Sequence, residues 1–153
     1  MIRRSLVAIL AATGLLLGMT ISPALAARPV FVFSTLLTPE AEVPASPDEE
    51  AIGHATVLIV PATDLVCWVV SWNRIDGAEV LAAHIHGPAT TEESVGPIVT
   101  FFQGVPHRTT DTDRGCTTSA AWADQIVDEP GMFYVNVHSN TIPAGAIRGQ
   151  LGD

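Results

Sequence analysis

The chain has 153 residues, of which 48% are hydrophobic, and a formal net charge of −9 at pH 7. This length suits one folded domain. All seven basic residues are arginines, set against 16 acidic residues, and a balance of that sign argues against binding to nucleic acid or to an anionic membrane surface.

The first 26 residues have the features of a cleaved export signal. Arg3 and Arg4 precede an apolar run at 6–21, and a small-x-small cleavage motif follows at 24–26. The run is too short to favour a spanning helix, which leaves an uncleaved anchor as the alternative. We therefore expect a secreted or periplasmic protein without a membrane span. Its mature part, 27–153, is expected to be one domain with five arginines against 16 acidic residues, and hence a net charge of −11.

Short β-branched or aromatic segments, bounded by Pro, Gly or acidic turns, predict a chain made almost entirely of strands. The predicted strands are 29–37, 52–60, 65–73, 80–87, 96–104, 132–139 and 144–151. The Pro-rich acidic segment 37–50 is expected to be a solvated connection or an edge segment, and 105–115 is expected to be a polar loop.

One helix is predicted, at 117–131, with Ser119 as its cap and Pro130-Gly131 as its end. Strands of this number and spacing predict an all-β sandwich or barrel. In the third predicted strand Trp68 and Trp72 share one face, which favours a packing role for both rings.

Cys67 and Cys116 are the only cysteines. An isolated pair in an oxidising compartment predicts one disulfide. It would close a loop of about 49 residues and constrain the unfolded chain by about 4 kcal/mol. Cysteines that bind a metal are usually closer, in a C-x-x-C arrangement, so the disulfide is the preferred interpretation.

The stretch LAAHIHGPAT, at 81–90, places two of the five histidines one residue apart. In a strand successive side chains alternate between faces, so His84 and His86 should share one face. Leu81, Ala83 and Ile85 should share the other.

The last two predicted strands repeat this division into an apolar and a polar face. In FYVNVH the apolar residues Phe133, Val135 and Val137 alternate with polar residues that face the other way. In AIRGQL the apolar residues Ile147 and Leu151 likewise face away from the polar residues between them. If these strands are close in space, their polar faces gather the side chains of His84, His86, His138, Asn136, Arg148 and Gln150.

Three histidines with an open position suit copper or zinc. The alternative is that His84 and His138 are hydrogen-bonding groups that hold loops, with no metal. His54 is expected at the surface or an edge, and His107 in a loop, solvated or as a fourth ligand. No nucleophile motif is present, so no catalytic residue is predicted.

The segments AAHIHGPA, GPIV, YVNVHS and PAGAIRGQL resemble the motifs of the CHRD domain, a module found in chordin and in many secreted bacterial proteins. The opening LLTPEAEVP followed by GHATVLIV is similar to that family's first two strands. The resemblance covers about residues 33–151 and implies an immunoglobulin-like sandwich or barrel of undefined activity. The histidine at 54 and the cysteine pair depart from the family pattern.

A fainter similarity is to copper/zinc superoxide dismutase, a Greek-key barrel with an H-V-H strand, a later V-V-H strand and an arginine on the final strand. The similarity implies that His84, His86 and His138 are copper ligands and that Arg148 guides an anion, with Asn136 and Gln150 beside them. The long zinc-binding loop and a bridging histidine are missing, so a copper-only variant is the most that this similarity implies.

Together these observations predict a Greek-key β-sandwich that acts as an extracellular binding module, with copper, before zinc, as candidate cofactor. An extracellular protein or a small ligand is the expected partner. The alternatives are a copper-only enzyme of superoxide-dismutase type and a metal-free structural or interaction domain. Imidazole nitrogens more than about 6 Å apart would exclude the metal site, because metal–nitrogen bonds are about 2 Å long.

Overall fold

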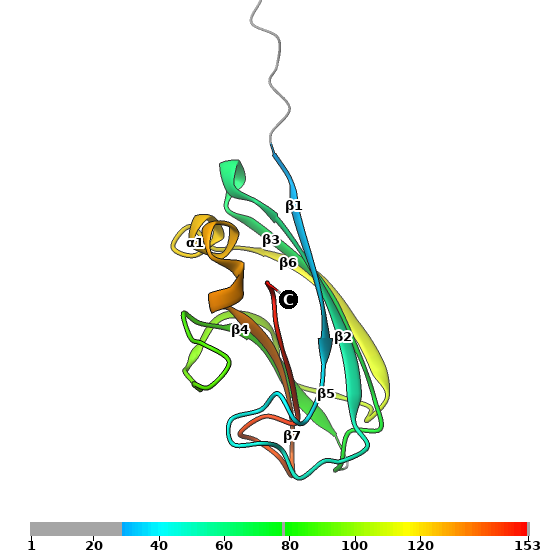
Figure 1. Ribbon diagram of the computed structural model, residues 1–153. Helices are drawn as coiled ribbons and strands as arrows, with labels where there is room; N and C mark the ends of the chain where they lie inside the picture. Colours follow the sequence, from blue (N-terminus) through cyan, green and yellow to red (C-terminus); the bar gives the residue numbers. More distant parts are fainter. Residues whose placement is uncertain (1–28, 78, 153) are drawn as a thin grey trace, which may run out of the picture.

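In the computed structural model, which describes residues 29–77 and 79–152, two four-stranded antiparallel sheets pack face to face (Figure 1). Sheet A has the order β1-β2-β3-β6 and sheet B the order β5-β4-β7-β8. In sheet A the strands are β1 (Phe31–Leu37), β2 (Ile52–Val60), β3 (Leu65–Asn73) and β6 (Asp111–Thr118). In sheet B they are β4 (Val80–His86), β5 (Pro97–His107), β7 (Tyr134–Ser139) and β8 (Ile147–Gln150). The predicted signal peptide lies outside the described residues.

The connections between the sheets form a Greek key. Strands β4, β5 and β6 are neighbours in space in the same order as in the chain. Strand β4 pairs with β5 in sheet B, and β5 contacts β6 of sheet A. Strand β7 then returns to lie beside β4, which is the Greek-key order. At the other side of the sandwich a bridge between Thr38 and Arg148 joins the end of β1 to β8. The predicted all-β Greek-key sandwich is confirmed.

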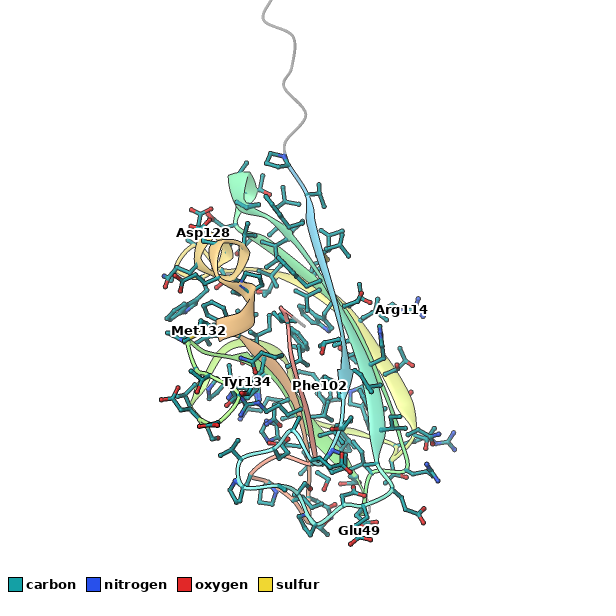
Figure 2. All side chains as sticks on the ribbon, viewed as in Figure 1. Glu49, Phe102, Arg114, Asp128, Met132 and Tyr134 are labelled. Atoms are coloured by element: carbon teal, nitrogen blue, oxygen red, sulfur yellow. A yellow bond between two sulfur atoms is a disulfide. The ribbon has the colours of Figure 1, made fainter. Side chains whose placement is uncertain are left out.

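The core lies between the sheets and is built from alternate positions of each strand. Trp68 of β3 stacks on Phe101 of β5 with ring centroids 4.6 Å apart, and Trp72 packs against Phe102 at 5.6 Å. Figure 2 shows Phe102 between the two sheets. The predicted packing role of both tryptophans is therefore confirmed.

Strands β2 and β3 have the predicted bounds, but the predicted loop at 105–115 is wrong. Strand β5 continues to His107, and β6 begins at Asp111. Two tertiary contacts hold the polar sequence of β6 as a strand. The indole Nε1 of Trp68 donates to Asp113 at 2.7 Å, and Cys116 forms the predicted disulfide with Cys67, opposite it on β3.

The predicted helix is shorter than expected, and the prediction of its cap is wrong. Helix α1 spans Ala123–Asp128, because β6 extends to Thr118 and a turn follows it. Trp122 is the N-cap residue, and Ser119 contributes only its main-chain carbonyl, to Trp122 and Ala123. The helix does end before Pro130, which begins the 3-10 helix η2 (Pro130–Met132).

The other short helix is the 3-10 helix η1 (Pro61–Thr63), between β2 and β3. None of the helices at 29–77 and 79–152 is long and apolar enough to cross a membrane.

The connection from β1 to β2 is only partly solvated, contrary to the prediction for 37–50. Glu42 and Asp48 are buried in it. The Asp48 carboxylate accepts hydrogen bonds from the main-chain N–H groups of Ala51, at 3.2 Å, and Asp76, at 2.7 Å. These bonds fasten the connection to the turn before β4, because a buried carboxylate needs partners.

Candidate metal centre

Three histidines meet on the face of sheet B that points away from the core. His84 and His86 lie on β4 and His138 on β7, the two inner strands of the sheet. His84 pairs with Asn136 and Ala82 with His138, and paired residues of neighbouring strands share a face. One ring nitrogen from each histidine lies within 4.8 Å of the other two. The structure thus brings together the three predicted ligands, well inside the 6 Å limit.

The strand that carries His84 and His86 contains a β-bulge near its start. The pairing register shifts between Val80 and Ala82. As a consequence Val80 belongs to the core, together with Ala83 and Ile85, whereas Leu81 faces the histidine side. The predicted apolar set is therefore wrong at Leu81, because the inserted residue reverses the alternation there.

Main-chain carbonyls orient two of the three rings. Nδ1 of His86 lies 2.7 Å from the carbonyl oxygen of Val95, and Nδ1 of His138 lies 3.1 Å from that of Pro143. A carbonyl only accepts, so each Nδ1 carries the proton and each Nε2 keeps a free electron pair. This leaves Nε2 of both rings as a metal-ligating atom.

The third ring is held between its two neighbours. Nδ1 of His84 lies 3.2 Å from Nε2 of His138. Nε2 of His84 and Nε2 of His86 are buried and have no hydrogen-bond partner in the described part of the chain. Gln103 of β5 lies close enough to His84 to affect its pKa, although no bond of normal geometry forms at Nε2.

All three imidazoles are held in the neutral form. Burial lowers the pKa of His86 to about 4, and the charges of His84 and Arg148 act in the same direction, against the Val95 carbonyl. Burial also lowers the pKa of His138 to about 4, helped by the charges of His84 and His86. The pKa of His84 is lowered by burial too, with Gln103 opposing the shift. Neutral rings are the form that binds metals.

The cluster forms the floor of an open recess of about 440 Å³. Apolar side chains of Leu81, Ala82, Pro97 and Pro143 line its walls, and Gln103 and Ser139 add polar groups. A metal held by the three rings would therefore have an open coordination position that small molecules can reach.

A loop at 87–96, which we call the strap, covers the neighbouring part of this face. Arg148 of β8 is 1% exposed and donates to the carbonyl oxygens of Glu93, at 2.7 Å, and Thr90, at 2.9 Å. Gln150 donates to Ala89 at 2.9 Å and accepts from Arg148 at 3.1 Å. Both side chains therefore hold the strap, and the Arg148 guanidinium lies outside the histidine cluster.

Tyr134 of β7 links the strap to the histidines. Its ring stacks on the ring of His86, at 4.9 Å between centroids, and the Arg148 guanidinium lies 3.5 Å from the centroid of the Tyr134 ring. Its hydroxyl bonds to both the N–H and the carbonyl of Val95, the residue whose carbonyl orients His86. Figure 2 shows Tyr134 beside the strap.

Asn136 lies between the histidines and a buried acid. Its amide donates to Glu42 at 3.0 Å. Burial raises the pKa of Glu42 to about 7, although the charge of Arg148 and the bond from Asn136 both lower it. One oxygen of Glu42 and the amide oxygen of Asn136 have no hydrogen-bond partner within the described ranges.

The other two histidines lie away from the cluster. His54 is exposed on β2, at the surface as predicted. His107 ends β5 and is half-buried against Phe102, at 4.3 Å between ring centroids, and near Asp111 and Asp113. The prediction of a solvated loop residue is therefore wrong for His107, because β5 extends further than expected.

Four residues that contribute to the site were not predicted from the sequence. Tyr134 follows the same alternation as Asn136 and His138, so the sequence alone places it on the histidine face, and a role for it in the site could have been predicted. The carbonyls of Val95 and Pro143 leave no signal in side-chain chemistry. Glu42 lies in a segment whose composition predicted solvent exposure.

Comparison with known proteins identifies a family. The model of the family described as CHRD domain matches residues 33–151. No curated protein and no solved structure gives a significant match. CHRD domains are typically extracellular modules.

Proposed function

Since this chain belongs to the CHRD domain family, we propose that it is an exported binding module that holds one transition metal, copper before zinc. His84, His86 and His138 are the ligands of this proposal. Export is supported by the signal-like N-terminal sequence and by the typical location of CHRD domains.

The observation that carries the proposal is the free Nε2 of His86. This atom is buried without a partner beside two other ring nitrogens. An unsatisfied buried polar atom costs about 1–3 kcal/mol, so a structure rarely keeps one without a use for it. A bound metal would satisfy it.

The spacing between the rings supports a shared ligand. Two nitrogens bound to one metal at 2.0–2.1 Å, with a tetrahedral angle between them, lie about 3.4 Å apart. Nδ1 of His84 and Nε2 of His138 are 3.2 Å apart. The ligand set of the proposal is therefore Nδ1 of His84 with Nε2 of His86 and His138. Nδ1 of His84 donates its proton to Nε2 of His138 without a metal, so this proton would move to the partnerless Nε2 of His84 when a metal binds.

The donor chemistry favours copper. Imidazole suits both copper and zinc, and copper binds a given nitrogen site more tightly. No carboxylate belongs to the cluster, so the site carries no negative charge to favour a harder cation. Because all three rings are neutral at pH 7, metal binding would release no proton from the cluster and would only move the proton of His84 from one ring nitrogen to the other.

Copper titration of the purified exported protein, followed by electron paramagnetic resonance, tests the proposal. We expect one equivalent of bound Cu²⁺ with a nitrogen-coordinated spectrum, retained to about pH 5 because the pKa values of His86 and His138 are about 4. His86→Ala should lower the affinity by more than the roughly 10–100-fold that loss of an outer partner costs.

His54→Ala is the matched control, because it removes an exposed histidine on the other sheet. It should leave the affinity unchanged. Copper binding that is absent, or that falls equally in both variants, would contradict the proposal and favour the metal-free alternative, in which the histidines only hold loops.

The open recess supports a second candidate, a copper-only enzyme of superoxide-dismutase type. The ligands line a recess that a small anion can enter. The buried, carbonyl-bound guanidinium of Arg148 favours a role in positioning rather than in anion guidance. Superoxide turnover by the copper-loaded protein, abolished in His86→Ala, would establish this activity, and its absence would leave the binding module.

A further inference from the structure

The outward face of sheet A has a composition unlike the rest of the molecule. It consists of the even-numbered positions of β1, β2 and β6 and the odd-numbered positions of β3. Four of its apolar side chains are strongly exposed, with exposed fractions of 59% for Val32, 56% for Leu36, 42% for Ile52 and 48% for Val69. Monomeric soluble proteins rarely expose an apolar patch of this kind without a function for it.

This face carries no carboxylate, although the chain has 16 acidic residues. Asp111 and Asp113 of β6 occupy the odd-numbered positions, so their side chains point away from the face. Arg114 is its only permanently charged residue, and Figure 2 shows this side chain on the outer side of β6. Glu50 and Asp64 lie just beyond its ends. Its exposed apolar residues Val32 and Leu36 lie on the edge strand β1, and Thr56 and Ser71 lie nearer its centre. A surface depleted in charged residues in this way is typical of a protein interface.

We propose that two copies of this chain pair through the outward faces of their A sheets. Two copies that each carry about −11 repel one another, and the repulsion is smallest where neither presents a carboxylate. A basic partner would instead seek the acidic turns, and an acidic partner would find only Arg114. A two-fold axis makes one patch serve as both halves of the interface, so an uncharged face is compatible with its own copy.

The size of the face supports a dimer of moderate strength. Four strands spaced about 4.8 Å apart, with up to nine residues that each rise about 3.4 Å, span about 19 by 30 Å. The resulting area of roughly 570 Å² is somewhat below the about 800 Å² per partner of a standard interface. Interfaces of this smaller size are typical of weak, transient complexes, so we expect a dissociation constant in the micromolar range. Added salt should strengthen the dimer, since it screens the repulsion between acidic copies.

Sedimentation velocity over a range of protein concentrations tests this proposal with three matched Val→Glu substitutions. Val69→Glu and Val32→Glu place a carboxylate on the face, and Val105→Glu places one on β5, at a valine that is 56% exposed. We expect dimers for the wild type and Val105→Glu, and a dissociation constant at least about tenfold higher for the other two. Val32 is the second site because Arg114 lies opposite Val69 and could partly neutralise a glutamate there.

A wild type that stays monomeric at high concentration, or dimers that persist in both face variants, would overturn the proposal. Thermal unfolding of each variant identifies any that fails to fold. The histidine cluster lies on sheet B, so copper binding should be unchanged in the two sheet A variants, Val69→Glu and Val32→Glu, and the test does not depend on the proposed metal site.

Discussion

The two outward faces of the sandwich differ in what covers them. The face of sheet A is open, apolar and almost uncharged. The face of sheet B is polar and carries three histidines, Arg148 and Gln150, and much of it is buried under the strap. A polar outer face is usually left to water, whereas here the chain folds over the polar face and leaves the apolar one open. Alternation along a strand therefore tells which residues share a face, and contacts from distant segments decide which face is covered.

The largest effect is expected from the disulfide that holds the edge of sheet A. Replacing Cys67 and Cys116 together by alanine should lower the free energy of unfolding by about 4 kcal/mol, because the bridge closes a loop of 49 residues. Urea unfolding followed by tryptophan fluorescence measures this. A loss below about 1 kcal/mol would mean that β6 is held by its other contacts.

The next largest effect separates the buried Arg148 of sheet B from the exposed Arg114 of sheet A. Arg148→Met should cost about 3 kcal/mol, because it removes two hydrogen bonds from a buried guanidinium to the carbonyls of Glu93 and Thr90 that hold the strap. Arg114→Met, on the open face, should change the stability by less than about 0.5 kcal/mol. Equal losses in unfolding experiments at low protein concentration would contradict the proposed difference between covered and open faces.

A pH-dependent effect of intermediate size is expected at Glu42. Its pKa is about 7 in the folded protein against an ordinary value of 4.5, so the folded state binds more protons than the unfolded state between these values. In the folded protein Glu42 is therefore mostly neutral below pH 7. The stability that this gives is fully present below pH 4.5 and is lost as the pH rises through 7.

Glu42→Gln replaces the buried carboxyl with a group that stays neutral, so it removes the loss of stability at high pH. It should stabilise the protein by about 1–2 kcal/mol at pH 8, with little change at pH 4.5. The histidines act in the opposite sense. Their lowered pKa values add stability above pH 6.5 that is lost as the pH falls towards 4, so the variant should lose stability more steeply in acid. Glu40→Gln, an exposed neighbour, is the control, and an equal gain at pH 8 in both variants would contradict the assignment.

The smallest effect is expected at Tyr134. Tyr134→Phe keeps the ring but removes the hydroxyl that bonds to Val95, at a cost of about 1 kcal/mol. If the Val95 carbonyl orients His86, copper affinity should fall by roughly tenfold as well. Ser34→Ala removes an exposed hydroxyl from sheet A and should do neither. An unchanged copper affinity in Tyr134→Phe would show that the ring alone positions His86.

The elements most accurately predicted from sequence are those in which local pattern and tertiary contacts agree. Strands β2 and β3 alternate cleanly, and the shared face of His84 and His86 follows from the pleat alone. Strand β6 was missed because its polar sequence becomes a strand through Cys116 and through the bond between Trp68 and Asp113. Both contacts join residues that are more than 40 positions apart.

Only part of the candidate site could be predicted from the sequence, for a similar reason. Side-chain chemistry indicated the three imidazoles, but the carbonyls that orient two of them and the burial of Glu42 depend on the paths of three loops. The bulge at the start of β4 also follows from pairing with its neighbours rather than from composition. Loop paths and bulges of this kind are not encoded in a two-residue period.

The position of the ligands within sheet B has a consequence for how a metal would come and go. Strands β4 and β7 are both flanked by hydrogen-bonded neighbours, and inner strands of this kind are among the last parts of a protein to open. The backbone that carries the imidazoles is thus preset before any ion arrives, unlike that of small domains that fold only around their metal. Loading and stripping by a chelator should therefore cycle repeatedly on an intact scaffold.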